Sequence, residues 1–139
     1  MQETAVRFAI CDDDKVYAEK MKALILQTFH LPQPVECVIY LNQEQILKCY
    51  REDKIDIVFM DIEFGDTIGF QVARRLSRQD SQLAVVYTTN YEHYITEAFV
   101  CRPLGFIRKS HAEDDLQIAG QEIRHFIGQK YSRFVFGGG

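Results

Sequence analysis

Three carboxylates follow two short apolar segments of the chain. Asp12 and Asp13 come directly after Val6 to Cys11, and Asp61 comes directly after Ile55 to Met60. Neither segment has a helical period, and apolar runs of this length are typical of strands buried on both faces of a parallel sheet. Ligands of open α/β sheets bind outside the carboxyl ends of the strands. The acids therefore stand where a site is expected, although Asp61 alone also fits an acid that caps a strand-to-loop turn.

A hydroxyl group and a cation follow two later predicted strands. Thr89 comes just past Leu83 to Thr88, and Lys109 comes just past Leu104 to Arg108. A carboxylate nucleophile, a metal site, a hydroxyl donor and an ammonium group are what phosphoryl transfer requires. We therefore predict that Asp61 attacks a phosphoryl group to form an aspartyl phosphate, whose oxygens contact Lys109 and Thr89. Each residue alone also fits an ordinary structural role, so the prediction rests on their joint placement.

The elements that must position these residues alternate between strand and helix. The predicted strands are Val6 to Cys11, Val35 to Leu41, Ile55 to Met60, Leu83 to Thr88 and Leu104 to Arg108. The first predicted helix runs from Lys15 to Phe29 behind an Asp14 cap, and the second runs from an Asn42 cap to about Arg51. The buried face of the third predicted helix is marked by Ile68, Val72, Ala73 and Leu76. That of the fourth is marked by Tyr91, Tyr94, Ile95, Ala98 and Phe99. The fifth begins at a Ser110 to Glu113 capping box, and its buried face is marked by Leu116, Ala119, Ile123 and Phe126 or Ile127.

This pattern predicts an α/β fold: a doubly wound (βα)5 three-layer sandwich with a flavodoxin-like parallel sheet in the strand order 2-1-3-4-5. The first and third strands are then neighbours, about 4.8 Å apart. Two like charges about 4 Å apart repel by roughly 4 kcal/mol at an effective dielectric near 20, so the acidic cluster must bind a proton or a cation. Because Mg²⁺ prefers oxygen ligands, we expect Mg²⁺ at Asp12, Asp13 and Asp61.

Composition excludes several classes of protein. The 139 residues fit one domain, and no apolar run reaches the length of a membrane span. The N-terminus lacks a signal peptide, so a cytoplasmic location is expected. The net charge of −4 argues against binding of nucleic acid by this chain itself. The four cysteines form no CxxC pair and are expected to be reduced, and the four histidines form no cluster that suits a transition metal.

The sequence resembles the receiver domain of bacterial two-component response regulators. The resemblance covers about Val6 to Ile127, and the segments that carry it are FAICDDD (Phe8 to Asp14), DIVFMDIEFGDTIGFQVARRL (Asp56 to Leu76), VVYTTNYEHYITEAF (Val85 to Phe99) and RPLGFIRKS (Arg102 to Ser110). The last two segments look most like receivers joined to LytTR-type DNA-binding domains. The resemblance implies that Asp61 is the phosphoacceptor, that Asp12 and Asp13 hold Mg²⁺, and that the backbone carbonyl of Glu63 is the remaining protein ligand.

The resemblance also implies a switch rather than a turnover enzyme. Thr89 matches the switch hydroxyl, Lys109 matches the lysine of the phosphate site, and Phe106 matches the aromatic residue that changes rotamer on activation. A sensor histidine kinase would be the phosphoryl donor. The fourth helix, fifth strand and fifth helix would form an output face and a possible homodimer interface. Transcription regulation would belong to the parent protein, and DNA would be bound only by an output domain absent from this chain.

Three positions depart from the usual receiver pattern. Gly65 stands where proline is usual, Asn90 where a small residue is usual, and Ser110 where proline usually follows the lysine. Glu63 and Tyr91 lie beside the predicted site, where similar proteins tune the lifetime of the phosphate. The departures leave the predicted chemistry intact and concern the rigidity of the loops.

The C-terminal segment Ile123 to Phe136 is basic and β-like in composition, and we expect it to leave the last helix. We therefore expect a receiver domain over residues 1–127 and, over residues 128–139, a tail, a linker or the start of an output domain of the LytTR kind. A frayed helix end on a receiver that stands alone is the alternative.

Other functions fit less of the pattern. A phosphatase of the haloacid dehalogenase type would place its nucleophile on the first strand. A flavodoxin-like FMN carrier would need a hydroxyl- and glycine-rich phosphate loop where this chain has three aspartates. A receiver-like interaction module that works without phosphorylation stays open, although it has no need for three clustered carboxylates.

Overall fold

The structure is a computed structural model that describes residues 4–91 and 102–136, and the side chains of 4–91 and 102–132. Its main strands are β1 (Val6–Cys11), β2 (Val35–Tyr40), β3 (Ile57–Asp61), β6 (Val85–Thr89) and β7 (Gly105–Arg108). A short hairpin adds β4 (Glu63–Phe64) and β5 (Thr67–Ile68). The helices are α1 (Lys15–Thr28), α2 (Gln43–Cys49), α3 (Gly69–Gln79), the 3-10 turn η2 (Lys109–His111) and α5 (Ala112–Phe136).

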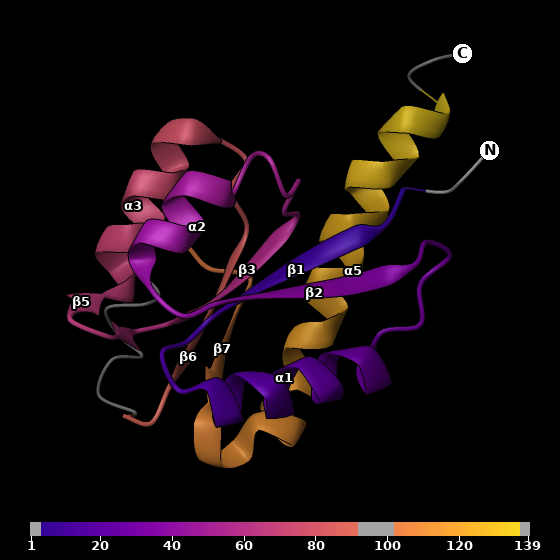
Figure 1. Cartoon of the computed structure of the whole chain (residues 1–139). Coiled ribbons are helices and arrows are strands. Elements are labelled where there is room, and N and C mark those ends of the chain that lie inside the picture. The colour runs from indigo at the N-terminus through magenta and orange to yellow at the C-terminus, as the bar shows by residue number, and fades with distance from the viewer. Residues whose placement is uncertain (1–3, 92–101, 137–139) are drawn as a thin grey trace.

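The five main strands form one parallel sheet in the order β2-β1-β3-β6-β7, as Figure 1 shows. This is the predicted order 2-1-3-4-5, since β4 and β5 lie outside the sheet. Parallel strands end at the same edge, so the carboxyl ends of β1 and β3 are neighbours. The predicted fold is therefore confirmed.

Helices cover both faces of the sheet. On one face, α1 and α5 pack against strand residues that include Phe8 and Phe59. On the other, α2 and α3 pack against strand residues that include Ala9 and Met60. Successive side chains of β1 and β3 thus alternate between two cores, which explains why these strands are apolar at nearly every position.

Two of the helix caps predicted from the sequence are present. The carboxylate of Asp14 accepts a hydrogen bond from the amide of Tyr17 at 3.1 Å, and the side chain of Asn42 accepts one from the amide of Gln45 at 3.0 Å. The predicted cap Ser110 instead lies inside the 3-10 turn η2, with its hydroxyl 2.9 Å from a ring nitrogen of the following residue. Local hydrogen bonding therefore fixes the starts of α1 and α2.

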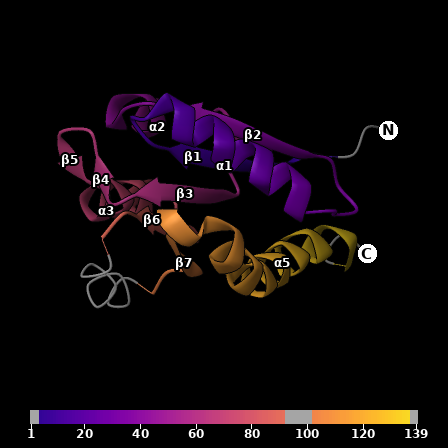
Figure 2. The ribbon, with the colours of Figure 1, turned by 90° about the horizontal axis from the view of Figure 1, so that it is seen from below.

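The segment that follows β3 is a short hairpin outside the main sheet. Glu63 pairs with Ile68 and Phe64 with Thr67, so β4 and β5 form an antiparallel hairpin with a two-residue turn. Gly65 opens this turn with a φ of 63°, a conformation that glycine adopts at little cost. Ile68, predicted on the buried face of the third helix, lies on β5 instead and is 39% exposed, because its strand pairing precedes the helix. The hairpin lies at the end of the molecule opposite the C-terminal end of α5 (Figure 2).

Helix α5 is longer than the sequence predicts. Ile123 to Phe136 was expected to leave the helix and become β-like, but it is helical throughout. Ile123 and Ile127 are buried on the core face, and Tyr131 continues that face at the same helical spacing. The expected domain boundary between residues 127 and 128 lies inside this helix.

The fourth helix predicted from Tyr91 onward falls, after Tyr91, outside the described residues. Among the helices that the structure does describe, none combines the length and the apolar character that crossing a membrane requires. The cysteines that it describes, Cys11, Cys37 and Cys49, are free.

Candidate phosphoacceptor site

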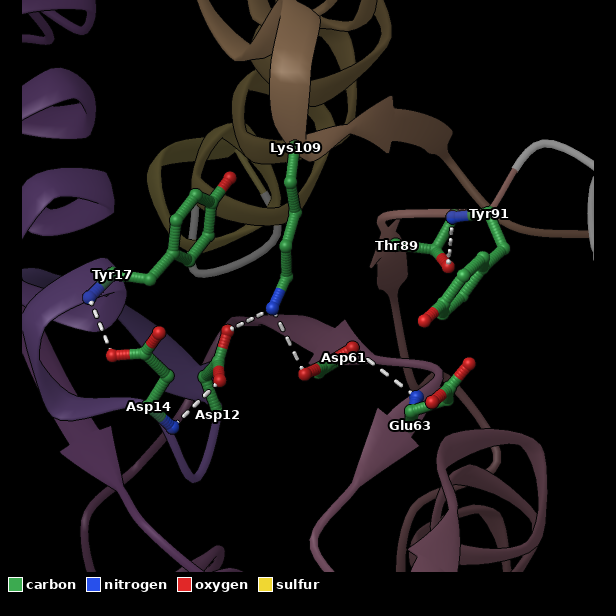
Figure 3. A network of polar contacts seen from close by, with 8 residues as sticks. All are labelled: Asp12, Asp14, Tyr17, Asp61, Glu63, Thr89, Tyr91 and Lys109. Carbon is green, nitrogen blue, oxygen red and sulfur yellow. Dashed lines mark hydrogen bonds and ion pairs between the residues drawn. The ribbon is translucent and has the colours of Figure 1, made fainter.

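Two acids share one ammonium group at the carboxyl edge of the sheet. The Nζ atom of Lys109 donates to Oδ2 of Asp12 at 2.7 Å and to Oδ2 of Asp61 at 3.0 Å (Figure 3). The side chains of Asp12, Asp61 and Lys109 are 2%, 7% and 9% exposed, so these ion pairs are shielded from water. The three residues come from the ends of β1, β3 and β7, which the parallel topology places at one edge.

Local turns orient both acids. Oδ1 of Asp12 accepts a hydrogen bond from the amide of Asp14 at 2.9 Å, and Oδ1 of Asp61 accepts one from the amide of Glu63 at 3.1 Å. Each aspartate therefore bonds the backbone two residues ahead, a habit of aspartate at turns. Each acid uses one oxygen for its own turn and the other for Lys109.

Asp13 completes an acidic cluster. Single carboxylate oxygens of Asp12, Asp13 and Asp61 all lie within 4.8 Å of one another. Asp13 is exposed, whereas the other two acids are buried. The sequence prediction that these acids converge is correct in geometry. Hard oxygen donors at this separation suit a divalent cation such as Mg²⁺.

The burial of the cluster shifts its titration. Burial raises the pKa of Asp61 to about 7, and the Asp12 carboxylate adds to the shift, whereas the Lys109 ammonium and the Glu63 amide oppose it. Burial acts to lower the pKa of Lys109, but hydrogen bonds and charges from Asp12 and Asp61 outweigh it and raise the pKa above its usual value. Lys109 therefore stays an ammonium group, and a cation bound at the cluster would favour the ionised form of Asp61.

Thr89 and Phe106 lie farther from the acids. Thr89 is 1% exposed at the end of β6, and its hydroxyl oxygen accepts a hydrogen bond from the amide of Tyr91 at 3.0 Å. Figure 3 shows Thr89 on the Glu63 side of Asp61. Phe106 is half-buried on β7 and packs against the core that includes Tyr87. Of the predicted site residues, Asp12, Asp61 and Lys109 are thus in direct contact, while Thr89 and Phe106 stand nearby on neighbouring strands.

The sequence pattern of the response regulator receiver domain family matches residues 8–120. The chain belongs to this family. The matched residues include both acidic segments, Thr89 and Lys109, so the resemblance noted from the motifs is confirmed.

Curated relatives of this receiver are sensory transduction proteins. LytT of Oceanobacillus iheyensis is 25% identical over 130 residues, which are 92% of this chain and 52% of the relative. LytT of Bacillus anthracis is 28% identical over 130 residues, 92% of this chain and 50% of the relative. LytR of Streptococcus mutans is 31% identical over 102 residues, 72% of this chain and 41% of the relative. The receiver thus spans about half the length of the curated relatives that it matches.

Solved structures of receivers share the fold. A response regulator receiver domain protein from Clostridium thermocellum has a TM-score of 0.72 at 21% identity, covering 91% of this chain and 97% of the other. The response regulator TrrA from Thermotoga maritima, solved in complex with Mg²⁺ and BeF, has a TM-score of 0.71 at 21% identity, covering 87% and 98%. At these identities the likeness establishes the fold.

Two residues of the receiver's site were not singled out from the sequence. Tyr17, in the first turn of α1, carried no predicted role in the site, yet Nζ of Lys109 lies 4.5 Å from the centroid of its ring. Gly69 begins α3 against β3, where a Cβ atom would lie 2.3 Å from the carbonyl oxygen of Asp61. The available signals were weak: a tyrosine in the first turn after the acidic loop, and a glycine at a predicted helix start.

Proposed function

We propose that this chain is a phosphorylation-dependent switch, phosphorylated on Asp61 by a sensor histidine kinase in the presence of Mg²⁺. One observation carries the proposal: the buried carboxylates of Asp12 and Asp61 share the ammonium group of Lys109 at 2.7 and 3.0 Å. An acid that only capped a turn would need neither a second buried acid nor a buried lysine. The proposal includes the cytoplasmic location expected from the sequence.

The proposed step transfers a phosphoryl group to a carboxylate oxygen of Asp61. One O–P bond forms, and the N–P bond of a phosphohistidine breaks. The electron pair of the broken bond leaves with the imidazole. Lys109, already within hydrogen-bonding distance of Asp61, would neutralise a phosphoryl oxygen. Because the chain only accepts and loses this group, it is a switch and not a turnover enzyme.

The acidic cluster fits Mg²⁺. Asp12, Asp13 and Asp61 would hold the ion together with the main-chain carbonyl of Glu63, as the family pattern implies. Bound Mg²⁺ supplies neutralisation of the charge on phosphoryl oxygens. The solved TrrA structure, which holds Mg²⁺ and BeF on the same fold, supports this assignment by analogy.

Thr89 and Phe106 would convert phosphorylation into a change of shape. The Thr89 hydroxyl accepts a hydrogen bond from the amide of Tyr91, and a hydroxyl that accepts one bond can also donate its hydrogen to a new acceptor. A phosphoryl oxygen on Asp61 would provide that acceptor. Movement of Thr89 toward it would leave space that Phe106, half-buried two strand positions before Arg108, could fill. The phosphoryl group would thereby bias a two-state equilibrium.

The output would pass through the face formed by β7 and α5, together with the fourth helix predicted from the sequence, whose residues after Tyr91 are not among those that the structure describes. A groove of about 300 Å³ runs along the described part of this face, and Leu104, Phe106 and Ala119 are among the residues that line it. Ile118 stands at the groove and is 75% exposed, more than any other large apolar side chain among the described residues. An apolar groove beside an exposed isoleucine supports the expected homodimer interface.

The parent protein would be a transcription regulator of the LytT and LytR kind. The chain spans about half the length of those relatives, and in this proposal DNA binding would belong to a separate output domain of the parent protein. In this proposal residues 1–127 form the receiver, and residues 128–139 lead toward the output domain. Since α5 is helical to Phe136, this connecting segment would begin as a helix.

Intact mass measurement tests the proposal. The chain is incubated with Mg²⁺ and a small acyl phosphate, alongside Asp61→Asn and the control Asp114→Asn, which changes an exposed acid on α5. One added phosphoryl group is expected on the wild type and on Asp114→Asn, and none on Asp61→Asn or without Mg²⁺. No adduct on any folded protein, and no binding of beryllofluoride, would favour the interaction module that works without phosphorylation.

A further inference from the structure

Four residues of the site form a closed ring of contacts, visible in Figure 3. Oδ1 of Asp12 accepts from the amide of Asp14 at 2.9 Å, and the carboxylate of Asp14 accepts from the amide of Tyr17 at 3.1 Å. The ring of Tyr17 faces Nζ of Lys109 at 4.5 Å, and Lys109 returns to Oδ2 of Asp12 at 2.7 Å. One carboxylate oxygen of Asp12 thus contacts Lys109 directly, and the other is linked to Lys109 through Asp14 and Tyr17 at the start of α1.

Besides the two acids, the Lys109 ammonium group lies against the ring of Tyr17. The two hydrogen bonds to Asp12 and Asp61 use two of its three N–H groups. An aromatic face within about 6 Å of a cation attracts it and excludes water, but offers no proton acceptor that competes with the carboxylates. The ring can therefore hold the ammonium group in place while leaving its hydrogens directed to the acids.

The hydroxyl group of Tyr17 has a different environment from the ring. Its oxygen is buried and has no hydrogen-bond partner among the residues that the structure describes. In Figure 3 the hydroxyl points away from Asp12 and Asp61. Since a buried hydroxyl without a partner does not stabilise the fold, the ring is what the site uses.

We propose that Tyr17 is a positioning residue of the phosphoacceptor site, whose ring holds Lys109 between Asp12 and Asp61 and shields it from water. Tyr17 acts through Lys109 and need not touch the phosphoryl group. The consequence for phosphorylation rests on the proposed function, whereas the shielding of Lys109 does not.

The direct test measures how fast Lys109 is acylated. Full-length wild type, Tyr17→Leu, Tyr17→Phe and Val16→Ala are treated with an N-hydroxysuccinimide ester of acetic acid, and modified lysines are located by mass spectrometry. Lys20, exposed on α1, is the internal reference, and Val16, 68% exposed on the same turn as Tyr17, is the matched control position. Tyr17→Leu is expected to accelerate acylation of Lys109 by about tenfold relative to Lys20, because the cation–ring contact is lost. Tyr17→Phe keeps the ring and should restore the slow rate.

Phosphorylation provides a second readout. With Mg²⁺ and a small acyl phosphate, Tyr17→Leu is expected to be phosphorylated about tenfold more slowly, while Tyr17→Phe recovers the wild-type rate. A general structural defect would change the acylation rates of both Lys109 and Lys20. Tyr17→Phe would then not restore the rate at Lys109 alone. If the wild type accepts no phosphoryl group, the proposed function fails, yet the acylation rates still decide the role of Tyr17.

Two results would overturn the proposal. One is a Lys109 acylation rate in Tyr17→Leu that equals the wild-type rate. The other is a Tyr17→Phe variant as exposed at Lys109 as Tyr17→Leu, which would assign the effect to the hydroxyl. Circular dichroism checks folding, and Tyr17→Met replaces Tyr17→Leu should the latter unfold. Unfolding of both variants would mark Tyr17 as a core residue and also reject the proposal.

Discussion

The hydroxyl of Tyr131 donates a hydrogen bond of 2.9 Å to Oδ2 of Asp56, a residue 75 positions earlier in the chain. Asp56 is 6% exposed just before β3, and it also accepts from the amide of Arg7 at 2.9 Å and pairs with Lys130 at 2.6 Å. Asp56 thus joins β1, β3 and the last turns of α5. This node lies at the opposite end of β3 from Asp61.

Tyr131→Phe is therefore expected to destabilise the fold. The substitution removes a hydrogen bond to a buried charged acceptor, so the free energy of unfolding should fall by about 1.5–3 kcal/mol. Urea unfolding followed by circular dichroism measures the change. Ser132→Ala, at an exposed position of the same turn, is the control and should change stability by less than about 0.5 kcal/mol. Equal stability of Tyr131→Phe and wild type would show that this contact does not hold α5 to the sheet.

Asp61→Asn is expected to stabilise the protein at high pH when Mg²⁺ is absent. Burial raises the pKa of Asp61 from 3.8 to about 7, so the folded state holds a proton that the unfolded state has lost. The contribution of Asp61 to stability is therefore complete below about pH 4, falls as the pH rises, and is lost once the pH passes about 7. Asparagine carries no charge and removes this decline.

The measurement is urea unfolding of wild type and Asp61→Asn in EDTA at pH 5 and pH 8. The free energy of unfolding of Asp61→Asn, relative to that of the wild type, should increase by about 1 kcal/mol or more from pH 5 to pH 8. The lost contact with Lys109 offsets part of this gain. An advantage that does not change with pH would mean that Asp61 does not titrate in this range.

Lys109→Met is expected to strengthen Mg²⁺ binding while slowing phosphorylation. The ammonium group occupies oxygens of Asp12 and Asp61 that the metal would use, and it repels a divalent cation. Removing one such charge should raise the affinity by about tenfold, close to 1.4 kcal/mol. Isothermal titration calorimetry measures the affinity, and Lys20→Met is the surface control. Weaker Mg²⁺ binding in Lys109→Met would contradict competition for these oxygens.

Gly69→Ala is expected to disturb the site through the backbone. A Cβ atom at this position would lie 2.3 Å from the carbonyl oxygen of Asp61 and 2.8 Å from the side chain of Met60, so α3 or β3 must move. Stability should fall by about 1–3 kcal/mol, and phosphorylation of Asp61 should slow. Thermal or urea unfolding and the intact mass assay measure the two effects.

Gly128→Ala is the matched control for this prediction. Gly128 lies within α5, and apart from its chain neighbours and the backbone of its own helix, no atom of the described residues lies within 4 Å of the position that its Cβ would take. Alanine should therefore stabilise the helix by about 0.5–1 kcal/mol. Opposite signs for the two substitutions would show that the close approach at Gly69, and not the change of residue type, is responsible.

The short apolar runs and the residues after them were sufficient to predict the strand order and the meeting of the acids. Parallel strands end at one edge, so Asp12, Asp61 and Lys109 had to converge once the strands were recognised. The caps at Asp14 and Asn42 were equally predictable, because each involves a hydrogen bond between residues three positions apart. Patterns that act over a few residues, or that follow from the topology alone, can be read in one chain.

Tertiary contacts decided the remaining features. The helical course of α5 past Ile123 depends on the buried positions that face the core and on the contact of Tyr131 with Asp56, which no local pattern reveals. The placement of the Tyr17 ring against Lys109 joins residues from two distant segments, and composition does not indicate which aromatic side chain a lysine will meet. The sequence by itself determined which chemical groups gather at the edge of the sheet, because topology sets that. Only packing between distant segments determined how those groups are held and how far α5 extends, because such contacts depend on side-chain shape and burial in three dimensions.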